Sequence, residues 1–106
     1  MMELEENKSQ IWYKVILEDG SAVENSKENF KNYFPQGEKK GAWYEKQGNQ
    51  GSLLVSNPKS LYKGGGKVYV VELSGSPLKE LLGEIYQKKF RLVREATAIE
   101  LGRFGI

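Results

Sequence analysis

The sequence predicts an α+β fold with a single mixed or mostly antiparallel sheet of about five to six strands and one main helix packed on one face. Three segments carry this prediction. Residues 11–18 alternate between two faces, one of them strongly apolar, which is typical of a strand. The run KVYVVEL at 67–73 is apolar on both faces, so it is expected in the centre of the sheet. Residues 77–90 carry a stripe at helical spacing, formed by Leu78, Leu81, Leu82 and Ile85.

The N-terminal third is expected to contain a tail, a hairpin and a short helix. Residues 1–8 read as a disordered acidic tail, and residues 9–106 as a single α+β domain. Asp19-Gly20 is a two-residue turn signal, so SAVE at 21–24 should return antiparallel to residues 11–18. Ser26 can cap a helix over KENFKNYF at 27–34, which Pro35 would end.

The remaining elements follow from turn and cap signals. AWYEK at 42–46 and SLLVS at 52–56 flank QGNQG, whose glycines suit the turn of a hairpin. NPKSLYK at 57–63 predicts a helical turn. Ser76 can cap the main helix and Pro77 suits its first position. RLVREATAIEL at 91–101 fits a strand or a helix ending at Gly102, and strand is the preferred assignment.

Composition limits the chemistry that the chain can perform. It contains no histidine and no cysteine, which excludes an imidazole base, thiolate catalysis, disulfides and zinc–sulfur sites. We therefore expect a binding protein rather than an enzyme, with no cofactor and no metal. The acidic N-terminus has no apolar leader, and no run approaches the ~18 apolar residues of a membrane span. A cytoplasmic protein without a membrane partner is expected.

Charge is unevenly distributed along the chain. The net charge is only +2, but residues 1–30 hold seven acids against three lysines, whereas residues 88–106 hold five basic residues against two acids. A basic C-terminal segment can indicate an anionic partner. The alternative is an ordinary solvated surface whose charges balance after folding.

The stretch LYKGGGKVYVVEL at 61–73 contains three consecutive glycines between lysines. A phosphate-binding P-loop requires a helix directly after the glycines, and a β run follows them here, so a mononucleotide site is not expected. Two interpretations remain. The glycines form a permissive connection into a core strand, or they let the backbone and its flanking lysines approach a sugar-phosphate chain closely.

Basic residues are interleaved with aromatic residues, a composition typical of surfaces that bind single-stranded nucleic acid or RNA. On the alternating pattern, Trp12 and Lys14 share the face opposite Ile11 and could stand together in solvent. The alternative is that most of these rings belong to the core. The expected nucleic-acid-binding residues are Trp12, Lys14, Trp43, Lys63, Lys67, Lys88, Lys89, Arg91 and Arg94.

Two further functions stay open. The first is a protein-binding or inhibitory module anchored by exposed aromatics, with Trp43, Tyr44 and Phe34 as candidates. The second is suggested by SLLVS, VYVVEL and a late glutamate, Glu95 or Glu100, which together resemble the layout of ADP-ribosyltransferases. That resemblance implies an NAD-consuming enzyme or an inactive relative. The sequence departs from the family in lacking a histidine and a clear arginine at the first strand.

Overall fold

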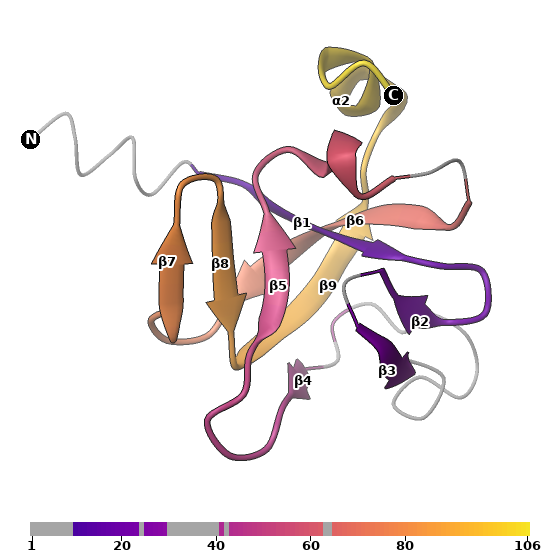
Figure 1. The fold of residues 1–106 in the computed structure, drawn as a ribbon. Helices are drawn as coiled ribbons and strands as arrows, with labels where there is room; N and C mark the ends of the chain where they lie inside the picture. The colour runs from indigo at the N-terminus through magenta and orange to yellow at the C-terminus, as the bar shows by residue number, and fades with distance from the viewer. Residues whose placement is uncertain (1–9, 24, 30–40, 42, 63–64) are drawn as a thin grey trace, which may run out of the picture.

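In the part of the chain that the structure describes, nine strands form one sheet, and every strand pair in it is antiparallel (Figure 1). The computed structural model describes residues 10–23, 25–29, 41, 43–62 and 65–106. The order along the sheet is β4-β9-β6-β1-β5-β8-β7, with β2 paired to β1 and β3 paired to β2. The strands are β1 (Trp12–Ile16), β2 (Ser21–Ala22), β3 (Asn25–Asn29), β4 (Trp43–Glu45), β5 (Ser52–Val55), β6 (Lys67–Leu73), β7 (Lys79–Leu81), β8 (Glu84–Gln87) and β9 (Lys89–Glu95).

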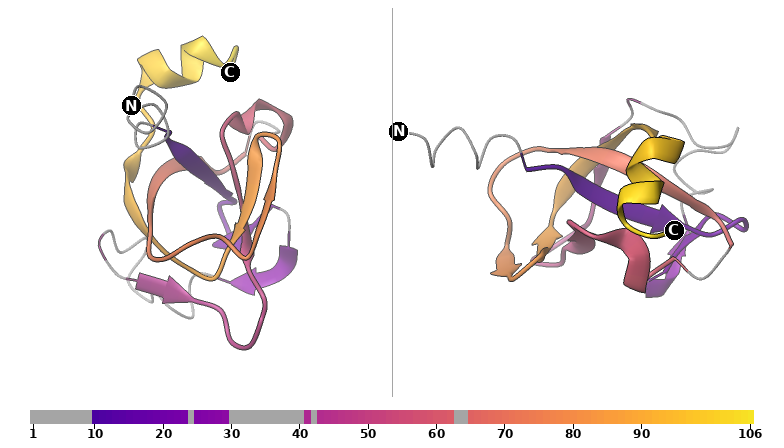
Figure 2. Two further views of the ribbon diagram at one scale, coloured as in Figure 1. Left: turned by 90° about the vertical axis from the view of Figure 1, so that its left-hand side faces the viewer. Right: turned by 90° about the horizontal axis from the view of Figure 1, so that it is seen from above.

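The sheet is strongly curled, so that its two halves face each other across a core (Figure 2). One cluster of buried side chains fills the concave side and takes residues from seven strands, among them Leu54, Tyr69 and Phe90. A second cluster lies on the other face of β1, β5 and β6 and includes Tyr13 and Val15. This second cluster is covered by Leu61 and Tyr62, which directly follow the 3₁₀ turn η2 (Pro58–Ser60), and by Leu101 and Phe104, at the C-terminal end of α2 (Ala98–Arg103).

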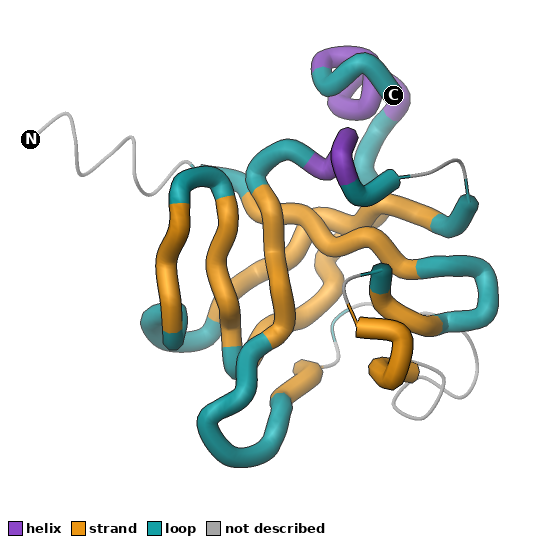
Figure 3. The backbone as a smooth tube through the Cα atoms, in the orientation of Figure 1, coloured by secondary structure: helices purple, strands orange, loops and turns teal. Residues whose placement is uncertain are grey.

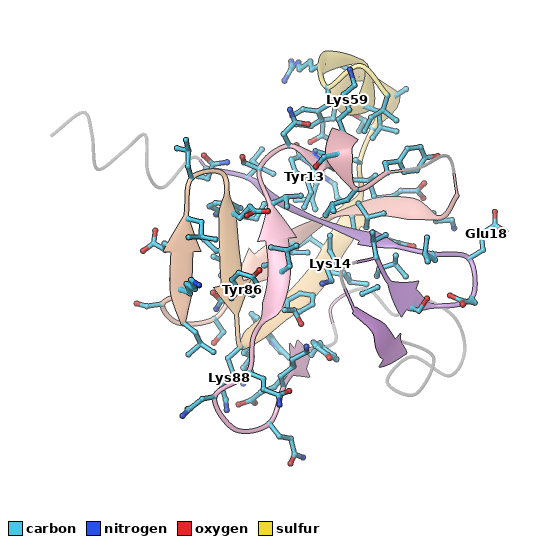
Figure 4. The ribbon with its side chains drawn as sticks, viewed as in Figure 1. Tyr13, Lys14, Glu18, Lys59, Tyr86 and Lys88 are labelled. Atoms are coloured by element: carbon cyan, nitrogen blue, oxygen red, sulfur yellow. The ribbon has the colours of Figure 1, made fainter. Side chains whose placement is uncertain are left out.

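Strand β1 is buried on both faces because the two clusters lie on either side of it. The predicted turn at Asp19-Gly20 is confirmed, since β2 pairs antiparallel with β1 and Gly20 has a φ of 90°. The expected exposure of Lys14 is wrong. Its side chain is only 1% exposed, and its Nζ donates a hydrogen bond to the Leu53 carbonyl oxygen at 3.0 Å (Figure 4). Sequence alternation cannot reveal this, because it treats one face of the strand as solvent.

The central position of KVYVVEL is confirmed, because β6 lies between β1 and β9. Gly66, directly before this strand, determines how the chain enters it. Gly66 has a φ of +83°, and a Cβ added there would lie 2.2 Å from the Ile16 carbonyl oxygen. Glycine is thus required where the chain turns beside the end of β1, as expected for a permissive connection into a core strand.

The predicted main helix over residues 77–90 is wrong. This segment forms the hairpin β7–β8 and the start of β9, and Leu82 and Gly83 make the turn. Gly83 has a φ of +77°, which supplies the turn geometry, and Ile85 pairs with Leu54 of β5. Of the apolar stripe only Ile85 is buried, while Leu78, Leu81 and Leu82 are exposed. Pairing with β5 therefore outweighs the local helical periodicity.

Strand pairing also changes the prediction for other segments. The sheet therefore contains more strands than the five to six expected. Ser26 and residues 27–29, predicted as the cap and start of a helix, lie in β3. Residues 30–35 lie outside the described residues, as does the tail at 1–8. The strands around QGNQG exist but do not pair with each other, because β4 pairs with β9 and β5 with β8. The helical turn at 57–63 is confirmed as η2, capped by Asn57.

The segment 91–101 contains both of the predicted alternatives, a strand followed by a short helix. Strand β9 ends at Glu95, Thr97 caps the short helix α2, and Glu100 completes a reciprocal capping box with Thr97. Helices are a minor part of the described fold, namely η2 and α2, which Figure 3 draws in purple. Among the residues that the structure describes, no helix is long and apolar enough to cross a membrane.

Candidate functional site

A row of exposed side chains crosses the outer face of β4, β9 and β6. Trp43 stands opposite Arg91 in the β4–β9 register, and Arg91 stands opposite Glu72 of β6. The alternate residues Tyr44 and Phe90 point into the core, where their ring centroids are 5.1 Å apart. This alternation is what turns the other set outward. We call this set the Trp43 face: Trp43, Glu45, Glu72, Lys89 and Arg91.

Two cations lie against the Trp43 ring. The Arg91 guanidinium carbon is 4.9 Å from the ring centroid, and the Lys89 Nζ is 5.7 Å from it. The ring remains 42% exposed. Arg91 is held from its other side, because its Nε donates to Glu72 Oε1 at 2.6 Å and its terminal nitrogen forms an ion pair with the same oxygen. The site is thus a row in which the Arg91 guanidinium lies between the Trp43 ring and the Glu72 carboxylate.

The Trp43 face lies at one end of the sheet. β4 is the last strand of the main path, so the described chain places no strand beyond it, and both cations come from β9 on its inner side. Next to the face is an open hollow of about 370 Å³, lined by Glu45, Lys46, Gln47, Gly48 and Lys88. The Lys88 Nζ donates to the Gly48 carbonyl oxygen at 2.5 Å, and Figure 4 shows Lys88 near the β4–β5 loop.

The structure brings together only part of the predicted nucleic-acid-binding set. Trp43, Lys89 and Arg91 form one cluster, with Lys88 beside it. Trp12 is partly buried and packs against the concave core, apart from this cluster. Lys14 is buried, so it is corrected to a core residue. Lys67 lies opposite Ile16, at the end of β6 remote from Trp43. Lys63 lies outside the described residues.

Arg94, the remaining predicted residue, belongs to a separate cluster around Glu100. Its two terminal nitrogens donate to the Glu100 oxygens at 2.6 and 3.1 Å. Glu100 also accepts from the Tyr13 hydroxyl at 3.0 Å and the Thr97 backbone N–H at 2.8 Å. Arg94 and then the Thr97 amide lower the pKa of Glu100 to about 2, while burial, followed by the Glu100 bond, raises the pKa of Tyr13. These contacts fasten α2 to β1 and β9.

Changing Glu100 to glutamine is expected to reduce stability at neutral pH and to weaken its acid dependence. The pKa of Glu100 is about 2 in the folded chain against an ordinary 4.5, so its stabilisation is present above pH 4.5 and lost as the pH falls toward 2. The expected loss at pH 7 is about 2 kcal/mol, a reduced value because the Arg94 side chain is 45% exposed.

Urea unfolding at pH 7, 5 and 3 measures this effect. Glu95→Gln, an exposed position at the end of β9, provides the matched control and should leave the wild-type acid dependence unchanged. If Glu100→Gln loses as much stability between pH 5 and pH 3 as the wild type does, Glu100 is not the group responsible.

The structure also shows where several candidate residues of the two alternative functions lie. Tyr44 is buried, which is a correction for the protein-binding anchors, and Phe34 lies outside the described residues. Glu95 is exposed, whereas Glu100 accepts hydrogen bonds from Arg94, Tyr13 and Thr97. The two glutamates therefore do not form a carboxylate pair. Over the described ranges, no three acidic side chains gather as metal ligands.

Sequence reasoning missed the two acidic members of the Trp43 face, Glu45 and Glu72. The sequence does contain a signal for Glu72. Glu72 is the one charged residue inside the apolar run VYVVEL, which places it on the outward side of its strand. The identity of its partner, however, depends on which strand pairs with β6.

Comparison with known proteins adds no family to this description. No protein-family model matches the chain, and no curated protein or solved structure shows significant similarity to it.

Proposed function

We propose that the chain is a binding module for single-stranded nucleic acid and that the Trp43 face is its contact surface. The observation that carries this proposal is a half-exposed tryptophan ring at the end of a sheet, with Arg91 and Lys89 packed against it. A base would stack on the ring, and backbone phosphates would meet Lys89, Arg91 and Lys88.

The arrangement suits a single strand for a steric reason. Stacking on a protein ring requires a base that is already unstacked, which single strands offer and duplexes withhold. Both cations approach the ring from β9, whereas the other side of β4 carries no strand of the described chain. Trp43 is 42% exposed, so part of its surface is accessible to a base.

Charge on this part of the surface favours an anion, although moderately. Lys46, Lys88, Lys89 and Arg91 contribute four positive charges, and Glu45 and Glu72 contribute two negative charges, which leaves +2. Such a surface predicts weak, salt-sensitive binding without base specificity, because stacking and phosphate contacts accept any sequence.

Fluorescence anisotropy of labelled twelve-nucleotide single strands and of a matched duplex tests the proposal. We expect saturable binding of the single strand at 50 mM salt and weaker binding of the duplex. Three phosphate contacts correspond to a slope of about −2 in log affinity against log salt, so affinity should fall about 15-fold between 50 and 200 mM salt. A flat titration for every oligonucleotide at low salt contradicts the proposal. A stoichiometric protein complex that resists salt and nuclease would favour the protein-binding alternative.

A further inference from the structure

Resting on the proposed function, we propose that Glu72 holds Arg91 as an internal substitute for a ligand phosphate and that binding requires the phosphate to displace it. Glu72 would then set the affinity of the site from within. The proposal concerns the row Trp43, Arg91 and Glu72, whose members come from three adjacent strands.

The contact geometry supports this role. Two nitrogens of the Arg91 guanidinium, Nε and a terminal nitrogen, converge on one oxygen of Glu72. Arginine binds phosphate oxygens through the same planar set of donors. The Glu72 carboxylate therefore occupies the position in which an anionic ligand oxygen would contact Arg91, next to the ring proposed to stack a base.

Exposure makes the displacement feasible. The side chains of Arg91 and Glu72 are 37% and 49% exposed, so water surrounds the pair and weakens it. When Glu72 leaves, Arg91 keeps its contact with the Trp43 ring, 4.9 Å away, and stays in place for the ligand. The displaced carboxylate remains near the ligand and repels it, which lowers affinity.

Glu45 provides a matched comparison on the same face. It stands opposite Lys89 in the β4–β9 register, as Glu72 stands opposite Arg91, but no ion pair joins it to a described residue. Glu45→Gln and Glu72→Gln therefore remove the same charge from the same surface. Only Glu72→Gln also releases Arg91.

The experiment compares single-strand affinity in the wild type, Glu72→Gln, Glu45→Gln and the double variant Glu72→Gln with Arg91→Gln. Glu72→Gln should bind about two- to fivefold more tightly at 50 mM salt, because no ion pair has to be broken before Arg91 meets the phosphate. Glu45→Gln should show a smaller gain. The double variant should lose the gain.

The outcomes separate the two proposals. If the wild type binds oligonucleotides and the two glutamine variants show equal gains or none, the role of Glu72 is overturned while the proposed function stands. If neither the wild type nor any variant binds at low salt, the proposed function itself fails. Matching thermal unfolding curves would show that the affinity changes do not come from altered folding.

Discussion

Replacing Gly66 with alanine is expected to destabilise the fold by about 3 kcal/mol, from a left-handed backbone that alanine adopts at a cost and from overpacking. The φ of Gly66 is +83°, and an added Cβ would lie 2.2 Å from the Ile16 carbonyl oxygen and 2.7 Å from the Leu17 Cα. These are backbone atoms at the end of a strand buried on both faces. The close approach can be relieved only by moving β6 away from β1.

The neighbouring Gly65 gives the control for this experiment. It has no positive φ, and a Cβ added there would meet nothing within 4 Å. Gly65→Ala should therefore leave stability within about 0.5 kcal/mol or raise it slightly, by restricting the unfolded chain. Urea unfolding followed by tryptophan fluorescence compares the two variants. Equal stabilities for the two would refute the structural role assigned to Gly66.

Replacing Trp43 with alanine is expected to weaken single-strand binding by about 10- to 100-fold, since one base stack contributes about 1–3 kcal/mol. The ring is 42% exposed, so its removal leaves the core clusters intact and should change the free energy of unfolding by less than about 1 kcal/mol. Trp43→Phe should retain part of the affinity, because a smaller ring still stacks. Anisotropy titration at 50 mM salt measures the three proteins.

Val93→Ala supplies the matched control for the loss of an apolar surface group. Val93 is also 42% exposed and lies on β9, two residues from Arg91, but its side chain has no π surface on which a base could stack. Its substitution should leave single-strand affinity unchanged. A Trp43→Ala protein that binds as well as Val93→Ala would show that the ring is not the stacking platform.

Local signals predicted the elements whose geometry depends on neighbours in the chain. The turn at Asp19-Gly20, the capped turn after Asn57 and the buried run of β6 are set by residues within a few positions, and the structure has all three. The residues of the proposed contact surface on β4 and β9 could also be predicted from the sequence. Trp43, Lys89 and Arg91 are an aromatic and two cations in segments with strand alternation.

The failures share a cause in long-range pairing. Residues 78–85 carry a helical stripe that is locally consistent, yet β5 offers Leu54 as a partner for Ile85, and the segment becomes a hairpin. Lys14 alternates like an exposed residue, but the curled sheet encloses both faces of β1. Only the folded arrangement decides such cases, because sheet pairing joins distant parts of the chain.

By itself, then, the sequence determined that imidazole and thiolate chemistry are missing, where the turns lie, and that a glycine precedes the central strand. Tertiary structure alone decided that Trp43, Arg91 and Glu72 share one row, since they come from strands far apart in sequence. Short-range conformational preferences act along the chain, whereas the contacts that build this surface form across strands, and their register is fixed only when both core clusters are packed.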